Sequence, residues 1–396
     1  MKSIFVLGLL SLSAVSVLAQ TRDKDVITTL EKVSQKLNQL SGVHYRYNRE
    51  MKYHADNYHN KDSATMYIDF KSGLPIGLRF QAKKTDAFFI YDGKMTIRLD
   101  NKNMTIDSTI ILQVKQLESN SFLFNSLASL RNNLPVVIAN DSIRKELSDT
   151  LVDGRNLISI RMEGRGMYLN PLKGINYFDE PGLRRPYFLL IDKQTLLPYQ
   201  FIAKIVNGTD DRDFIKVTYL DIQQNPVSPA SDSWSYANYQ NKYKPYVEPR
   251  KVAVVKPGAP IPFFNYPVFN PMKSDSLSLT DLKGKVVLLE FWFKSCGPCI
   301  KAMPHYNDLQ QKFGKNNFEL VTINIEDGIE DIEFFYKKYP PSYKMLYNGL
   351  GLFEALGFNG CPSSLLVDRN GKAARTFFGF DQEAIEKSIS ELLKVQ

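Results

Sequence analysis

The spacing of apolar residues changes along the chain. Over residues 25–40 apolar residues recur every three or four positions, which predicts an amphipathic helix. From about residue 43 to residue 222, short runs alternate between apolar and polar positions, as in strands with one buried face. The Asp92-Gly93 pair between two such runs predicts a hairpin. Residues 121–132 have the spacing of a second helix.

A helix laid on a curved antiparallel sheet buries these patterns, so the first part of the chain is predicted to be an α+β domain. Its last strands carry two turn sequences, at 189–193 before Leu197-Pro198 and at 217–222 before Asn225-Pro226. In that order they resemble LolA-type domains, which are half-open β-barrels over helices. The resemblance implies a barrel mouth that holds an apolar ligand. The alternative is a sheet that buries only its own helix.

A different pattern begins at residues 286–289, a continuous apolar run that predicts a fully buried strand. Cys296 and Cys299 follow it, where a helical pattern begins. The first helical turn has unpartnered N–H groups and partial positive charge, so it lowers the pKa of a thiol at Cys296 from its free value of about 8.5. Cys299 lies about one turn further on, close enough to attack a mixed disulfide formed at Cys296.

The Cys-Gly-Pro-Cys sequence after a strand and Phe291-Trp292 resembles the thioredoxin active site. Residues 276–285, which lead into the strand, resemble the TlpA/ResA-like branch of thioredoxins, whose members are exported across a bacterial membrane. The resemblance covers residues 257–396 and implies an α/β thioredoxin fold. Ser295 departs from the pattern, because thioredoxins commonly carry Trp there, and substrate docking is expected to differ as a result.

The resemblance also implies roles for single residues. Glu290 lies six positions before Cys296, where a buried acid of thioredoxins accepts a proton from the second cysteine through water, so it is a candidate general base for Cys299. Pro362 matches the cis-proline that faces the active site. Contacts to substrate are expected from residues around the motif and this proline: Trp292, Gly297, Pro298, Cys361 and Pro362.

Cys361 has two interpretations. It precedes the expected cis-proline, where related domains often carry Val, Ile or Thr, and so it can act as a small apolar side chain. Alternatively it is an auxiliary thiol that exchanges with a disulfide at Cys296. A zinc site made by the three cysteines and His305 is the less favoured interpretation, because Gly-Pro between two cysteines favours redox chemistry. We expect no metal, and no cofactor other than the redox-active Cys296–Cys299 disulfide.

Composition and charge limit the number of domains, the kind of partner and the role of the cysteines. The chain has 396 residues, 43% of them hydrophobic, which suits about two domains. A net charge of +8 is spread over interspersed acids and bases, so nucleic acid is not an expected partner. All three cysteines fall after residue 295, so they serve chemistry rather than stapling the fold.

The first residues have the pattern of a signal peptide. Lys2 is followed by an apolar stretch over residues 4–12 and by small residues ending at Ala19. The alternative is an uncleaved anchor. We expect residues 1–19 to be removed and the protein to be soluble in the periplasm or cell envelope. The predicted domain boundaries are 20–231 for the β-rich, LolA-like domain, 232–256 for a linker rich in Pro, Ser and Tyr, and 257–396 for the thioredoxin-like domain.

The sequence therefore favours an exported thiol-disulfide oxidoreductase. Its expected partners are exported proteins that contain disulfides, together with a membrane electron donor, because the compartment itself is oxidising. The alternative is a binding protein for an apolar ligand or a lipoprotein, with an accessory redox domain. The direction of electron flow stays open at this point.

Overall fold

The computed structural model describes residues 25–247 and 253–394, so the signal peptide expected over residues 1–19 lies outside the described residues. The chain forms two compact units, divided after Val247. In the described part of the chain, no helix combines the length and the apolar character that a membrane span needs.

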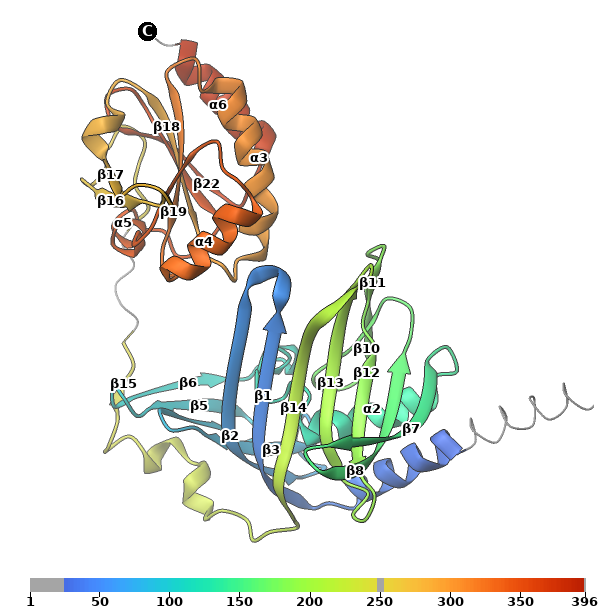
Figure 1. Ribbon diagram of the computed structural model, residues 1–396. Helices are drawn as coiled ribbons and strands as arrows, with labels where there is room; N and C mark the ends of the chain where they lie inside the picture. Colours follow the sequence, from blue (N-terminus) through green and yellow to red (C-terminus); the bar gives the residue numbers. More distant parts are fainter. Residues whose placement is uncertain (1–24, 248–252, 395–396) are drawn as a thin grey trace, which may run out of the picture. The chain divides into compact units, whose positions relative to one another are not determined.

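The first unit is built on one large, predominantly antiparallel sheet, which Figure 1 shows strongly curved. Its strand order is β15-β6-β5-β4-β3-β2-β1-β14-β13-β12-β8-β7, with β11 paired to β13. The strands that form it are β1 Gly42–Tyr53, β2 Tyr58–Phe70, β3 Leu78–Lys83, β4 Ala87–Tyr91, β5 Met95–Asp100, β6 Thr105–Ile110, β7 Arg144–Val152, β8 Arg155–Glu163, β11 Leu183–Arg184, β12 Tyr187–Asp192, β13 Pro198–Asn207, β14 Asp210–Gln224 and β15 Lys244–Pro245.

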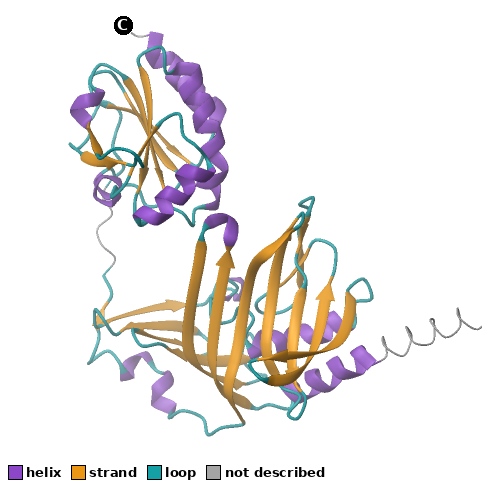
Figure 2. Ribbon diagram, in the orientation of Figure 1, coloured by secondary structure: helices purple, strands orange, loops and turns teal. Residues whose placement is uncertain are grey.

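The inner face of this sheet is covered by two helices, one over residues 25–38 and α2 over Leu127–Ile138 (Figure 2). Leu30 and Leu37 from the first helix, and Leu130 and Leu134 from α2, share one buried cluster with the inward side chains of the strands. The predicted mostly-β unit with few helices is therefore confirmed, as is the β4–β5 hairpin at Asp92-Gly93. A small separate hairpin pairs β9 Met167–Leu169 with β10 Ile175–Tyr177.

The second predicted helix was wrong in its bounds. It was expected over residues 121–132, whereas α2 begins at Leu127 and runs to Ile138. Asn125 has a φ of 51°, which interrupts a helix, and the Ser126 Oγ then caps α2 by accepting a hydrogen bond from the Ser129 N–H at 3.1 Å. The helix also continues through Pro135, which a sequence pattern treats as a breaker.

The first part of the predicted linker at 232–256 is packed on the sheet and is not an extended spacer. Residues 226–246, which we call the strap, cross the outer face of the sheet and end as β15, parallel to β6. Trp234 and Tyr243 of the strap are buried in a cluster with outward side chains of β2, β4, β5 and β6. A stretch rich in Pro, Ser and Tyr suggested an extended spacer, but these two aromatic side chains anchor it to the sheet.

The second unit has a seven-stranded sheet in the order β17-β16-β20-β19-β18-β21-β22, with helices on both faces. Helices α3, α4 and α6 contribute to the buried cluster on one face, and α5 contributes to the cluster on the other. The elements are β16 Asn265–Val268, β17 Asp275–Ser278, β18 Val286–Trp292, α3 Gly297–Phe313, β19 Phe318–Asn324, α4 Ile329–Lys338, β20 Lys344–Leu346, α5 Leu350–Ala355, β21 Ser363–Val367, β22 Ala373–Phe378 and α6 Gln382–Lys394. The central strand β18 is buried at every residue, as its apolar run predicts.

Removing the strap's anchor tests its structural role. In a protein consisting of residues 20–247, Trp234→Ala is expected to lower the free energy of unfolding by about 3–5 kcal/mol, because it empties a buried aromatic site. Tyr246→Ala is the control, since Tyr246 belongs to the strap but is half exposed, and it is expected to cost less than about 1 kcal/mol. Urea unfolding followed by circular dichroism gives both values. Equal effects of the two substitutions would show that the strap is not anchored by Trp234.

Candidate active site

Two cysteines form a disulfide at the start of α3. Cys296 is the N-cap residue and is bonded to Cys299 in the first turn, whose N–H points to the Cys296 Sγ at 3.2 Å. Cys299 is fully buried and Cys296 is 4% exposed. The sulfur at the N-cap faces the unpartnered N–H groups and the positive end of the helix dipole, so its thiolate is stabilised once the pair is reduced.

The loop before the cysteines is fixed by acidic residues that follow β19. The Lys294 N–H donates to Asp327 Oδ2 and the Lys294 Nζ contacts Asp331 Oδ2, each at 2.6 Å. The Asn324 side chain also donates to Asp327, at 2.7 Å. These contacts hold the chain between β18 and α3, so Cys296 is presented at a defined position.

Glu290 lies in the middle of the sheet, on β18. It is opposite Thr322 of the parallel strand β19 and opposite Ser364 of the antiparallel strand β21. All three side chains are completely buried. The register therefore places a row of polar groups across three strands in an otherwise apolar core.

Burial raises the pKa of the Glu290 carboxyl group from its ordinary value of 4.5 to about 8. The hydroxyls of Ser364 and Tyr306 offset part of this rise, although neither completes a hydrogen bond of normal geometry to the carboxyl group. Tyr306 comes from α3, and the Tyr343 ring packs against it with centroids 6.0 Å apart. The pKa of each tyrosine is raised mainly by burial, and the charge of Glu290 adds to both shifts.

The loop before β21 forms the second wall of the site. The Cys361–Pro362 peptide bond is cis, and the Pro362 carbonyl accepts a hydrogen bond from the Gly379 N–H at 2.9 Å. Cys361 is partly exposed and carries a free thiol. Burial raises the pKa of that thiol from 9.0 to about 12, and the negative charges of Glu290 and Glu326 add to the rise. The structure therefore favours Cys361 as a small apolar side chain over a reactive thiol.

The residues expected to contact substrate differ in accessibility. Gly297 and Pro298 are exposed, and apart from the adjoining residues and the backbone of α3 no atom lies within 4 Å of the position that a Cβ on Gly297 would occupy. Trp292, in contrast, is 1% exposed and packs edge-on against Phe335, with centroids 5.5 Å apart. The structure does not support its expected contact with substrate, because β18 is covered on both faces and the indole is buried in a cluster with residues of α3 and α4.

Comparison with known proteins assigns the second unit. Residues 256–393 match the family model described as Redoxin. A thiol-disulfide oxidoreductase ResA from Halalkalibacterium halodurans is 27% identical over 128 residues, which are 32% of this chain and 73% of that protein. ResA from Geobacillus thermodenitrificans is 28% identical over 159 residues, 40% of this chain and 84% of the relative. The second unit is a thiol-disulfide oxidoreductase domain of the thioredoxin family.

Among solved structures, this thioredoxin domain is similar to a Chlorobium tepidum protein described as a thiol:disulfide interchange protein DsbE. The two share 30% identity with a TM-score of 0.33, over 35% of this chain and 99% of that one. The Redoxin match begins at residue 256, so it does not assign the first unit. The thioredoxin-like fold expected for the C-terminal part is confirmed, and so is thiol-disulfide oxidoreductase activity.

Sequence reasoning missed the groups around Glu290. Tyr306, Tyr343 and Ser364 come from α3, from the chain before β20 and from β21, and none of them belongs to the Cys-Gly-Pro-Cys motif. Only the strand register brings Ser364 opposite Glu290, and only the packing of α3 brings Tyr306 there. Ser364 directly precedes the apolar run at residues 365–367, which predicts a buried strand and is the one hint that the sequence contains.

The raised pKa of Glu290 makes stability depend on pH. Between the unfolded value of 4.5 and the folded value of about 8, the folded protein binds more protons than the unfolded chain. The free energy of unfolding therefore falls as pH rises through this window, by at most about 5 kcal/mol. Glu290→Gln is expected to flatten the fall, as measured by urea unfolding of the oxidised protein at about pH 5 and about pH 9.

The control for this experiment is Glu391→Gln, which removes an exposed carboxylate from α6. It is expected to keep the pH dependence of the wild type. The account of Glu290 is contradicted when Glu290→Gln loses as much stability as the wild type between the two pH values.

Cys361 gives a second test. A thiol with a pKa of about 12 is alkylated roughly a thousandfold more slowly near pH 8 than a free cysteine, because so little thiolate is present. Iodoacetamide labelling followed by mass spectrometry measures the rate in the folded, oxidised protein, with the urea-unfolded protein as the control. Cys361→Val is expected to leave turnover nearly unchanged. Rapid labelling, or a Cys296–Cys361 disulfide in the peptide map, would establish the auxiliary thiol instead.

Proposed function

We propose that the protein is an exported reductant of disulfides in envelope proteins, and that its Cys-Gly-Pro-Cys site carries the reaction. The observation that carries this proposal is the Cys296–Cys299 pair at the N terminus of α3, with the buried Glu290 on the strand that leads into it. Glu290 favours a reductant, since many TlpA-like chains have a neutral residue at that position. The relatives named ResA support thiol-disulfide exchange in general.

The proposed reaction begins with both cysteines reduced. The Cys296 thiolate attacks one sulfur of a substrate disulfide, which forms a mixed disulfide and releases the first substrate thiolate. Glu290 accepts the proton of Cys299, and the Cys299 thiolate then attacks the Cys296 sulfur. The second substrate thiolate leaves, and the Cys296–Cys299 disulfide forms. Two electrons have passed from the protein to the substrate, and the two substrate thiolates take up protons from Glu290 and from solvent.

We propose that an extended substrate segment docks over Gly297 and Pro298, beside Cys361 and Pro362. Gly297 and Pro298 are exposed, and the cis bond before Pro362 presents backbone to this face. Each turnover consumes the dithiol, so a donor must reduce it again. In an oxidising compartment we assign that role to a membrane electron donor, consistent with the signal-peptide pattern over residues 1–19.

For the first unit we propose that the described residues 25–247 form a LolA-like half-barrel, which extends the predicted domain of residues 20–231 by the strap, and that the thioredoxin domain begins at residue 257. Its support is the curved, predominantly antiparallel sheet laid over two helices (Figure 1). Those helices fill the inner face, where an apolar ligand was expected. A carrier of apolar cargo is the second candidate function. To bind cargo on the inner face, such a carrier requires the two helices to move away from the sheet.

Two cysteine variants test the proposed reaction. Cys296→Ser is expected to abolish reduction of insulin disulfides by dithiothreitol-coupled turnover, because the attacking thiolate is lost. Cys299→Ser is expected to accumulate mixed disulfides with partner proteins, because the resolving thiol is lost. Non-reducing gels and mass spectrometry detect these adducts, and Cys361→Val is the control for loss of a cysteine outside the pair. Full turnover by Cys296→Ser would sink the proposal.

A further inference from the structure

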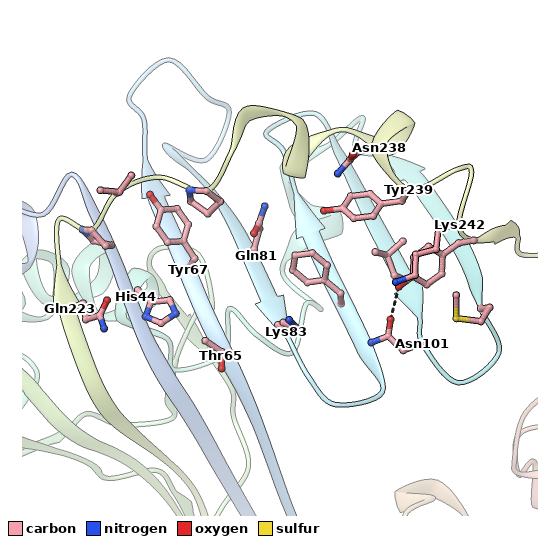
Figure 3. A pocket seen from close by; sticks show the side chains of 17 residues that line it. His44, Thr65, Tyr67, Gln81, Lys83, Asn101, Gln223, Asn238, Tyr239 and Lys242 are labelled. Carbon is pink, nitrogen blue, oxygen red and sulfur yellow. Dashed lines mark hydrogen bonds between the residues drawn. The ribbon is translucent and has the colours of Figure 1, made fainter.

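The first unit has a pocket on the outer face of its sheet, under the strap. Its volume is about 950 Å³, which is in the range of small-molecule sites. Figure 3 shows Gln81 and Lys83 of β3 on the sheet side, and Asn238 and Tyr239 of the strap above them. The pocket lies opposite the two helices, so it is separate from the inner face where an apolar ligand was expected.

The strap holds this pocket open by bonding to the sheet at two places. At one, the Gln81 side chain donates to the Ser233 carbonyl and hydroxyl at 3.1 and 3.0 Å. At the other, the Tyr243 hydroxyl donates to the Asn101 side chain at 2.8 Å, a bond drawn in Figure 3. Between these anchors Tyr239 packs edge-on against Phe88, with centroids 6.1 Å apart. The cavity is thus framed by ordered contacts within the unit.

The lining has a single sign of charge. Lys83 reaches the pocket from β3 and Lys242 from the strap, whereas none of the lining residues is Asp or Glu. In the described part of the chain neither ammonium group has an ion pair with a carboxylate; Lys242 lies only over the Tyr243 ring, at 5.4 Å from its centroid. Two uncompensated cations beside one cavity favour an anion there.

His44 of β1 lines one end of the pocket and is partly exposed. Its Nδ1 is buried and has no hydrogen-bond partner in the described part of the chain, so this atom faces the surrounding protein and not the pocket.

The remaining lining mixes flat aromatic surface with amide groups. Tyr67, Phe88 and Tyr239 offer rings, and Gln223 and Asn238 offer donors and acceptors. A purely aliphatic ligand would leave these amides unpaired. A neutral sugar presents mainly hydroxyl donors, for which carboxylates are the strongest acceptors, and the lining has none. The composition suits an acidic group attached to an apolar or aromatic body.

We propose that this pocket binds a small organic anion, with a carboxylate, sulfonate or phosphate group balanced by Lys83 and Lys242 and an apolar body packed on Tyr67, Phe88 and Tyr239. The first unit is then a ligand-binding domain in its own right. The proposal does not rest on the redox function, because every residue that lines the pocket belongs to the first unit.

The test uses two dyes that share a skeleton and differ in charge. Anilinonaphthalene sulfonate is an aromatic anion, and N-phenylnaphthylamine is its neutral counterpart. Fluorescence titration of the full chain is expected to show one saturable site for the anion, at least about threefold tighter than for the neutral dye at low salt. Added salt is expected to weaken binding of the anion only.

Charge variants locate the site. Lys83→Gln combined with Lys242→Gln is expected to weaken binding of the anionic dye about fivefold, since each exposed charge contributes about a factor of two. Thr65→Glu, which adds the carboxylate that the lining lacks, is expected to weaken it similarly. Lys32→Gln combined with Lys173→Gln is the matched control: it removes two exposed lysines of the same unit that do not line the pocket.

The control pair of substitutions is expected to leave the dissociation constants of both dyes unchanged. All variants are expected to keep the wild-type circular dichroism and insulin-reducing activity. Three results would each overturn the proposal. One is the absence of saturable binding of the anionic dye. Another is equal affinity for the two dyes at low salt. The third is an unchanged dissociation constant for the anionic dye in both Lys83→Gln/Lys242→Gln and Thr65→Glu.

Discussion

The constraint that shapes the second unit is one carboxyl group, that of Glu290, buried at the centre of its sheet. Glu290 sits on β18, with strands on both sides and no complete hydrogen bond to any protein group in the described part of the chain. Such a group is tolerated in its neutral form, and its pKa of about 8 reflects that preference. The arrangement destabilises the fold as pH rises, so its benefit has to be sought in the chemistry next to it.

A pKa near the working pH lets one carboxyl group exchange protons in both directions. In the proposed mechanism, the charged form of Glu290 takes the proton of Cys299 while a substrate disulfide is reduced. Its neutral form would return a proton to the same sulfur when a donor reduces the Cys296–Cys299 disulfide. Burial raises the pKa of Cys361, and the charge of Glu290 adds to that rise, so the third cysteine is kept as a thiol.

The first unit follows a different physical plan. Its sheet is covered on the inner face by two helices and on part of the outer face by the strap, and each layer has its own buried cluster. The inner layer is apolar and closed. The outer layer includes a pocket lined by Lys83 and Lys242, neither of which has an ion pair with a carboxylate in the described part of the chain. The anion site proposed there shares no residue with the redox domain.

Local sequence was sufficient for the core of the redox site. The apolar run before Cys296 and the helical pattern after it specify β18 and α3 through short-range rules. The cis bond before Pro362 was implied by the resemblance to thioredoxins and not by the local sequence. Packing between residues far apart in the chain could not be predicted from the sequence. The strap was predicted to be a spacer, but Trp234 and Tyr243 are buried. Trp292 was expected to contact substrate because it lies near the cysteine motif, and the sequence alone does not show that both faces of β18 are covered.

The most direct test of this account is the rate at which Cys299 resolves a mixed disulfide at Cys296. In a Cys361→Val background, reduced protein mixed with Ellman's reagent forms the mixed disulfide, and the second release of thionitrobenzoate in stopped flow reports its resolution. The account predicts a resolution rate that increases through about pH 8 and falls roughly 10- to 100-fold near neutral pH in Glu290→Gln. The same rate and the same pH profile with and without Glu290 would contradict it.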